Sequence, residues 1–239
     1  MKKLINSVDN VVDEMLNGMT AAFPQYIERV PGTDVVARTG AKKTDKVVLI
    51  SGGGSGHEPA HGGYVGKGML DAAVAGAVFT SPTPDQVYEA IQATECGKGA
   101  LLIIKNYTGD VMNFEMAADM AADEDIVVDK VVVADDVAVE NSTWTTGRRG
   151  IAGTVFVHKI AGACAETGAD LPEVKRIAEK VIANVRSMGM AVSPARFPLS
   201  ENPALTLRMT KSRSASAFTA SPELTAKRSL PSTTRSTIW

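Results

Sequence analysis

A run of glycines directly after a short apolar stretch constrains this chain more than any other feature. Val47–Ile50 is apolar, mostly β-branched and bounded by polar residues, which predicts a buried strand. Four of the five residues in Gly52–Gly56 are glycine, so the backbone there allows close approaches that side chains forbid. His57 follows immediately. We therefore expect a small ligand to lie against bare N–H groups, beside an imidazole that titrates near neutral pH.

Apolar strands and amphipathic helices alternate along the body of the chain. Further strands are expected at 76–79, 100–105 and 131–134, and helices at 5–23, 85–95, 111–122, 154–167 and 171–187. This alternation predicts an α/β fold with a mostly parallel sheet and flanking helices. Polar loops at 51–58, 105–110 and 135–149 follow the carboxyl ends of three strands. Open α/β sheets bind ligands at that edge, so we expect these loops to share one crevice.

Composition excludes several classes of function. The chain has 239 residues and a net charge of −2, which argues against a nucleic-acid partner or an anionic membrane surface. Its two cysteines, Cys96 and Cys164, suit a reducing compartment and provide no disulfide framework. No signal peptide and no apolar span of about 18 residues is visible. We expect a cytoplasmic protein with no membrane partner.

The glycine run does not match the common glycine-rich motifs. It lacks the Gly-Lys-Ser/Thr ending of a phosphate-binding P-loop. A dinucleotide fingerprint is a poor match because the helix that should follow is interrupted by Pro59, His61, Gly62 and Gly63. A nucleophile elbow needs glycine where His57 stands. A tight structural turn remains the alternative to a ligand site.

The histidines are candidates of unequal strength. His57 and His61 have the spacing of metal ligands on a helix face, but Pro59 lies between them and a third ligand is missing. We expect no metal site, and prefer His57 as a hydrogen-bonding acid or base. His158 lies within a helical run and is expected to be a structural or surface residue.

Lys105 and Asp110 bracket the second polar loop and have two possible roles. They fit an anchor at the end of a strand and a cap at the start of a helix. They equally fit a cation that orients a ligand oxygen and a carboxylate that removes a hydroxyl proton. Gly147–Gly150, with two arginines, opens a further helix and either caps it or meets an anion or a partner.

Six motifs in order resemble the substrate-binding K subunit of dihydroxyacetone kinases. The resemblance runs from Met1 to about Pro194, and the motifs are GGGSGHEP, FTSPTPD (79–85), LLIIKNYTGD (101–110), NFE (113–115), DDVAV (135–139) and TGRRGIAGT (146–154). It implies a dihydroxyacetone-binding α/β domain at 1–194, followed by a truncated second domain.

The resemblance also implies roles for individual residues. It implies that the substrate is surrounded by Gly54, Ser55, Gly56, His57, Ser81, Lys105 and Asp110. The residue matching Asp110 is the base on the attacking hydroxyl, and the one matching His57 assists proton movement and holds the substrate. A further histidine, in a GIHGEPG segment, binds the substrate carbonyl as a hemiaminal, but no histidine follows His158 here.

Cofactors and partners follow from the same resemblance. The chain itself is expected to bind neither cofactor nor metal, because ADP or ATP with magnesium belongs to a separate L-type subunit. In bacteria a phosphotransferase-system protein commonly recharges that nucleotide. Full-length relatives are commonly homodimers, and some K-like relatives are non-catalytic sensors that co-activate transcription, which is the alternative function.

Residues 195–239 differ in composition from the rest of the chain. They contain no glycine, aspartate or valine, 15 of the 45 are Ser or Thr, and seven Lys/Arg face two Glu. A basic, Ser-rich disordered tail is one interpretation of this composition.

The genetic code provides a second interpretation of these residues. A coding string for the family-like segment DDEIEIGIGIHGEPGI, read one base later, spells MTKSRSASAFTASPE, which is 209–223 of this chain. The histidine codon then straddles Phe218 and Thr219. We therefore predict that 195–239 is translated out of frame, with one base missing after the Pro194 codon.

Overall fold

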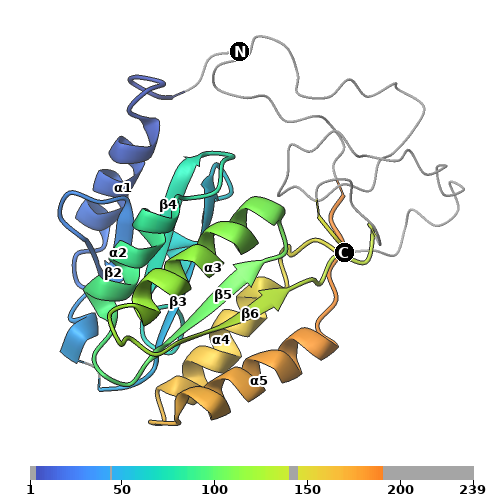
Figure 1. Cartoon of the computed structure of the whole chain (residues 1–239). Coiled ribbons are helices and arrows are strands. Elements are labelled where there is room, and N and C mark those ends of the chain that lie inside the picture. The colour runs from blue at the N-terminus through green and yellow to red at the C-terminus, as the bar shows by residue number, and fades with distance from the viewer. Residues whose placement is uncertain (1–3, 44, 140–144, 191–239) are drawn as a thin grey trace, which may run out of the picture.

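The computed structural model describes residues 4–43, 45–139 and 145–190, which build a sheet covered by helices on both faces (Figure 1). Its six strands lie in the order β1-β2-β4-β3-β5-β6. Their bounds are β1 Ile27–Arg29, β2 Val35–Arg38, β3 Val48–Ser55, β4 Ala72–Val78, β5 Ala100–Lys105 and β6 Val128–Val133. Strands β4, β3, β5 and β6 are parallel, and β1 and β2 add an antiparallel edge. The predicted α/β fold with a mostly parallel sheet is confirmed.

Within the described residues, five α-helices form the two outer layers. They are α1 Val11–Ala22, α2 Pro84–Thr94, α3 Thr108–Ala122, α4 Thr154–Ala165 and α5 Leu171–Asn184. Short 3-10 turns lie at Ala41–Lys43 and Gly62–Tyr64. Helices α1, α4 and α5 supply one hydrophobic core, and α2 and α3 supply the other. Among the described residues, no helix is long and apolar enough to cross a membrane.

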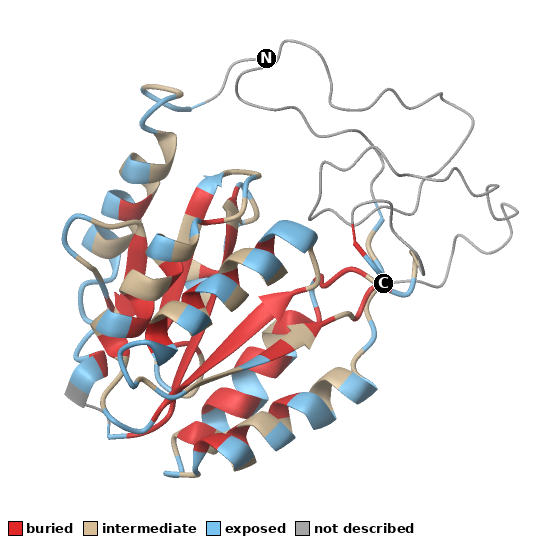
Figure 2. Cartoon of the chain, viewed as in Figure 1, coloured by how far each residue is buried: buried red, intermediate tan, exposed pale blue. Residues whose placement is uncertain are grey.

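Strand β5 separates the two cores because its side chains alternate between the faces of the sheet. Leu101 and Ile103 pack against the first core, whereas Leu102 and Ile104 pack against the second. The strand is buried along its whole length, as Figure 2 shows. A strand covered on both faces is expected to be a continuous apolar run, which is what the sequence showed.

The glycine run is largely strand, and the expectation of a loop from residue 51 is wrong. Strand β3 continues to Ser55, and Gly52–Gly54 pair with residues 74–76 of β4. The register shifts between Gly54 and Ser55, where the strand ends. Glycine is therefore used here for close packing of backbones within a sheet, a role that periodicity alone does not reveal.

Other boundaries also differ from the expectations. Helix α1 begins at Val11 instead of residue 5, and α3 begins at Thr108, so Asp110 lies in its first turn and does not cap it. The sequence pattern did not predict strands β1 and β2, because they have only three and four residues. The expected tail at 195–239 lies outside the described residues.

The loops after β5 and β6 lie together at the carboxyl edge of the sheet. The side-chain amide of Asn106 donates hydrogen bonds to the carbonyl oxygens of Thr146 (3.0 Å) and Arg148 (2.7 Å). Ser55, at the end of β3, pairs with Val78 at the end of β4. The described parts of the loops after β5 and β6 therefore contact each other, whereas a crevice that they share with 51–58 stays a prediction.

Candidate active site

The turn after β4 folds back onto the end of β3, and glycine makes this possible. A methyl group at Gly54 would lie 2.5 Å from the Thr80 nitrogen and 2.8 Å from the Phe79 carbonyl carbon. Gly56 has a φ of 104°, and a methyl there would lie 2.9 Å from the Phe79 ring. Real Cβ atoms do not approach so closely, so both glycines are required for residues 79–81 to lie against β3.

Lys105 and Asp110 are buried charged groups on either side of the β5–α3 turn. Lys105 ends β5 and is 4% exposed, and Asp110 in the first turn of α3 is 6% exposed. Burial lowers the pKa of Lys105, although the nearby carboxylates of Asp110 and Asp135 oppose this shift. Burial raises the pKa of Asp110, opposed by a hydrogen bond from Ser81 and by the charge of Lys105. A desolvated carboxylate of this kind is a stronger base than one in water.

Ser81 joins this pair from the turn before α2. Its side chain hydrogen-bonds Asp110. A methyl at Gly109 would lie 3.4 Å from the Ser81 Cβ, which places the start of α3 against this turn. Asn113 donates a hydrogen bond of 2.7 Å to the carbonyl of Pro82 and fixes the turn from the other side. Helix α2 then begins at Pro84 with a capping box between Thr83 and Gln86.

His57 lies at the rim of the site. Its ring centroid is 5.0 Å from that of Phe79. Burial and then the charge of Lys105 lower the pKa of His57 to about 4, so the imidazole is neutral at pH 7. A neutral imidazole beside a lysine can exchange a proton or hydrogen-bond a ligand without carrying a charge. The neighbouring Gly56 N–H donates to the Glu58 carboxylate at 3.0 Å, and Ser55 donates to the Gly76 carbonyl at 2.7 Å.

Two further histidines line a small pocket together with Lys105, and sequence reasoning missed their pairing. His61 and His158 are 97 positions apart, yet His61 Nδ1 is 3.4 Å from His158 Nε2. Both are buried, and His158 has no exposed surface. His158 is thus not a surface residue. No sequence signal pairs these residues, because only the packing of α4 against the sheet brings them together.

The described part of the loop after β6 is held together by hydrogen bonds and an ion pair among its own residues. Asp135 accepts hydrogen bonds from the backbone N–H groups of Ile151 (2.7 Å) and Gly153 (2.8 Å) at the start of α4. Arg149 binds Asp136 through two nitrogens, at 3.1 and 2.8 Å. Of the two alternatives for Gly147–Gly150, the geometry favours the structural one, because Arg149 is buried and already holds a carboxylate.

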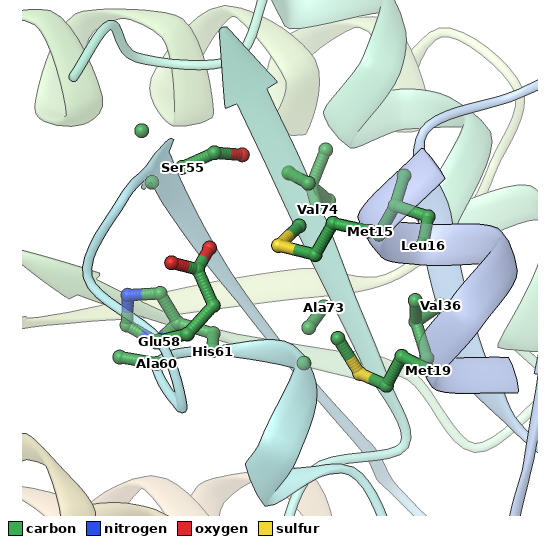
Figure 3. Close-up of a pocket in the computed structure, with 14 residues that line it drawn as sticks. Met15, Leu16, Met19, Val36, Ser55, Glu58, Ala60, His61, Ala73 and Val74 are labelled. Atoms are coloured by element: carbon green, nitrogen blue, oxygen red, sulfur yellow. The ribbon is translucent and has the colours of Figure 1, made fainter. Parts of the chain in front are cut away.

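A pocket opens beside the glycine strand (Figure 3). It contains about 310 Å³ of space, part of it open to solvent, between α1 and the segment after β3. Met15 and Met19 face it from α1, and Glu58 and His61 face it from the opposite side. Within the described part of the chain, no group of three or more His, Cys, Asp or Glu residues is arranged to hold a metal ion.

Fold and site together define an α/β protein with buried charged and polar side chains gathered at the carboxyl edge of its sheet. The family model for the Dak1 domain matches residues 17–213. The chain belongs to the Dak1 domain family.

Named relatives agree with this assignment. The chain is 62% identical over 198 residues to a protein of Listeria innocua named PTS-dependent dihydroxyacetone kinase 1, dihydroxyacetone-binding subunit DhaK. The match covers 83% of this chain and 60% of that protein, so the chain spans less than two thirds of its relative's length.

Solved structures resemble it as well. One is the dihydroxyacetone kinase from C. freundii in complex with AMP-PNP and Mg²⁺, with a TM-score of 0.78, 42% identity, and coverage of 84% of this chain and 37% of that chain. Another is the dihydroxyacetone kinase operon co-activator Dha-DhaQ, with a TM-score of 0.76, 38% identity and coverage of 83% and 60%.

Proposed function

We propose that this chain is the substrate-binding part of a dihydroxyacetone kinase. The observation that carries the proposal is the convergence of Lys105, Asp110 and Ser81 beside the close-packed glycines of β3. Identity of 62% to a dihydroxyacetone-binding subunit supports the same substrate. Gly54, Ser55, Gly56 and His57 complete the proposed site, which we place in the cytoplasm.

In the proposed reaction, Asp110 acts as the base. A hydroxyl oxygen of dihydroxyacetone attacks the terminal phosphorus of the donor, the bond from that phosphorus to its leaving group breaks, and Asp110 takes the hydroxyl proton. The raised pKa of Asp110 suits this step, because a base works best when its pKa approaches the working pH. Lys105 faces the developing negative charge, and neutral His57 hydrogen-bonds the substrate and passes protons.

The phosphoryl donor is proposed to reside on an L-type partner subunit. There, ADP or ATP with magnesium carries the phosphoryl group and neutralises its charge. The C. freundii kinase, solved with AMP-PNP and Mg²⁺, supports a nucleotide in the complete system. This chain is proposed to bind neither nucleotide nor metal, and its full-length form to be a homodimer.

The predicted loss of the hemiaminal histidine limits what this chain can do. Because no histidine follows His158, dihydroxyacetone is held by hydrogen bonds alone, so its binding is weak and reversible. We expect turnover to be badly impaired, and to return when the reading frame after Pro194 is restored by one inserted base.

The test combines binding with turnover. Titration with ¹³C-labelled dihydroxyacetone, followed by NMR, should show saturable binding to this chain. Dihydroxyacetone phosphate formation with a bacterial L-type subunit and the phosphotransferase proteins should be slow for this chain and much faster after frame restoration. Absence of saturable binding to both proteins would refute the proposed substrate, and normal turnover by this chain would refute the role of the missing histidine.

A second candidate is a non-catalytic dihydroxyacetone-binding sensor. It is favoured by the similarity to the co-activator Dha-DhaQ, at a TM-score of 0.76. The buried pair of Lys105 and Asp110 favours the kinase, because a sensor needs no base. A frame-restored protein that binds dihydroxyacetone but gives no turnover with any L-type subunit would favour the sensor.

A further inference from the structure

Helix α4 is apolar on both of its faces. Val157 and Ala161 belong to the core under the helix and have no exposed surface. On the opposite face, Phe156 is 60% exposed and Ile160 is 45% exposed. A helix at a protein surface normally has a polar outer face, and a helix that is apolar all round is normally covered on every side. The sequence of α4 is therefore that of a helix with a second layer of protein over it.

Helix α5 adds a second apolar row beside this face. Ile177, Val181 and Val185 are four positions apart, so they lie on one side of the helix. The two helices lie side by side on the same face of the sheet (Figure 1). The space between them, which we call the α4–α5 groove, is lined mainly by Phe156, Ile160, Ile177, Val181 and Val185. It contains about 920 Å³ of space, part of it open to solvent.

The described chain ends a few residues after this groove. Val185 directly follows the last residue of α5. The chain then runs along the loop after β6, where the Ser187 N–H donates to the Asp135 carbonyl at 2.9 Å. Met188 and Met190, the last described residue, are each 66% exposed. Apolar side chains therefore continue along the chain from the groove to the point where the description stops.

The relatives of this chain have further polypeptide to place. The family model includes both helices of the groove, since it matches residues 17–213. The matches to the Listeria innocua protein and to Dha-DhaQ each cover only 60% of that relative. Large continuous apolar surfaces on soluble proteins usually mark a place where another segment or partner binds. The polypeptide that follows α5 is the nearest candidate along the chain.

We propose that, in the frame-restored protein, the polypeptide that follows residue 194 packs an apolar segment into the α4–α5 groove. The connection from Val185 is short, so little chain entropy is lost when the following residues turn back onto the two helices. The inference rests on the predicted out-of-frame translation, and it does not depend on which small molecule the site binds. In the chain as it stands, the same apolar side chains face solvent.

The first test places a carboxylate in the groove of both proteins. In this chain, Ile160→Glu exposes its charge to water, so the Tm should change by no more than about 2 °C. In the frame-restored protein the same carboxylate is buried without a partner, so the Tm should fall by at least about 5 °C. Met116→Glu is the matched control, because Met116 is 53% exposed on α3. Its Tm change should be equal in the two proteins.

The second test measures the cover directly and does not depend on the glutamate variant folding. Ile160→Cys is made together with Cys96→Ser and Cys164→Ser, and its reaction with a maleimide is followed by mass spectrometry. The thiol should react at least about tenfold more slowly in the frame-restored protein, because the covering segment must first open. Met116→Cys in the same background should react equally fast in both proteins.

Three results would overturn the inference. Equal Tm losses for Ile160→Glu in the two proteins, or equal labelling rates for Ile160→Cys, would show that nothing after residue 194 covers the groove. Labelling of this chain alone that slows as its concentration rises would assign the groove to a second copy. Protection that appears only when an L-type subunit is added would assign it to that partner.

The same samples separate this inference from the proposed function. Dihydroxyacetone titration of the frame-restored protein tests the substrate, and a protected groove without dihydroxyacetone binding would leave the inference standing while the proposed function fails. If restoring the frame gives no folded protein, the predicted out-of-frame translation is wrong and the inference fails with it.

Discussion

The loops after β5 and β6 both bury charged side chains, but they satisfy them differently. In the β6 loop, Asp135 accepts two backbone hydrogen bonds, and Asp136 holds Arg149 through two nitrogens. Beside the β5 loop, Lys105 and Asp110 are also buried. Burial is the main influence on the pKa of each group, and it favours the neutral form of both side chains.

The difference distinguishes a loop that supports the fold from a loop with reactive side chains. The carboxylates of Asp135 and Asp136 accept hydrogen bonds on both of their oxygens. Asp110 is a buried carboxylate whose desolvation outweighs its hydrogen bond, so it is poised to take up a proton. The β6 loop therefore positions the start of α4, whereas Asp110 and Lys105 beside the β5 loop are the base and the cation of the proposed site.

The largest effect on stability is expected from breaking the β6 pair. Asp136→Ala removes the carboxylate that the buried Arg149 guanidinium binds through two nitrogens, which should lower the free energy of unfolding by about 3–5 kcal/mol. Urea unfolding monitored by circular dichroism measures this change. Glu173→Ala, which breaks an exposed pair with Arg176 on α5, is the control and should cost under about 1 kcal/mol. Equal losses of stability in Asp136→Ala and Glu173→Ala would show that the buried ion pair contributes no more than the exposed one.

Asp110→Asn should show the opposite behaviour. The amide removes the base, so turnover of the frame-restored protein should fall by about 10²–10⁴-fold. The free energy of unfolding at pH 7 should stay the same or rise, because a neutral amide avoids the cost of burying a charge. A loss of stability similar to that of Asp136→Ala would mean that Asp110 belongs to the scaffold.

Lowering the pH should decrease the stability of the folded protein, because burial lowers the pKa of its three histidines. The pKa of His57 is lowered to about 4 and that of His158 to about 3, mainly by burial, and that of His61 is also lowered. Below pH 6.5 these histidines bind protons in the unfolded chain but stay neutral in the folded protein. The free energy of unfolding therefore has its full value above pH 6.5 and decreases toward pH 4. Each histidine contributes about 1.4 kcal/mol per pH unit in this window.

Asp110 opposes this trend, since its raised pKa means that the folded protein holds a proton longer than the unfolded chain. Its contribution therefore decreases as the pH rises. Unfolding midpoints of the unaltered chain and of His158→Gln, measured between pH 7 and 4.5, report the balance between the histidines and Asp110. A variant with an unchanged pH slope would show that His158 is protonated in the folded protein.

The smallest of these effects concerns the link between the two loops. Asn106→Ala removes the amide that donates to Thr146 and Arg148. The expected cost is about 1–2 kcal/mol, because each lost hydrogen bond contributes about 1 kcal/mol. Thermal unfolding measures it, and dihydroxyacetone titration should show a loss of affinity if the β6 loop supports the β5 loop. A large loss of stability with unchanged affinity would show that the loops act independently.

The amino-acid sequence by itself determined the elements that carry local signals. Strand β5 and helix α2 agree with the expectations to within a residue, because continuous apolar runs and capping residues act over short distances. The ordered motifs identified the family resemblance and with it the candidate residues Lys105 and Asp110. Periodicity did not find β1 and β2, whose three and four residues are too short to show it.

Only the tertiary structure decided how these residues act. It placed His61 against His158 across 97 positions and joined Asp136 to Arg149. It also divided the glycines, which look alike in the sequence: at Gly52 and Gly54 neighbouring atoms exclude a side chain, whereas at Gly53 an alanine would fit. The physical reason is that sequence patterns report interactions between near neighbours along the chain. Burial, close approach and unpaired buried atoms depend on which distant segments the sheet and helices bring together.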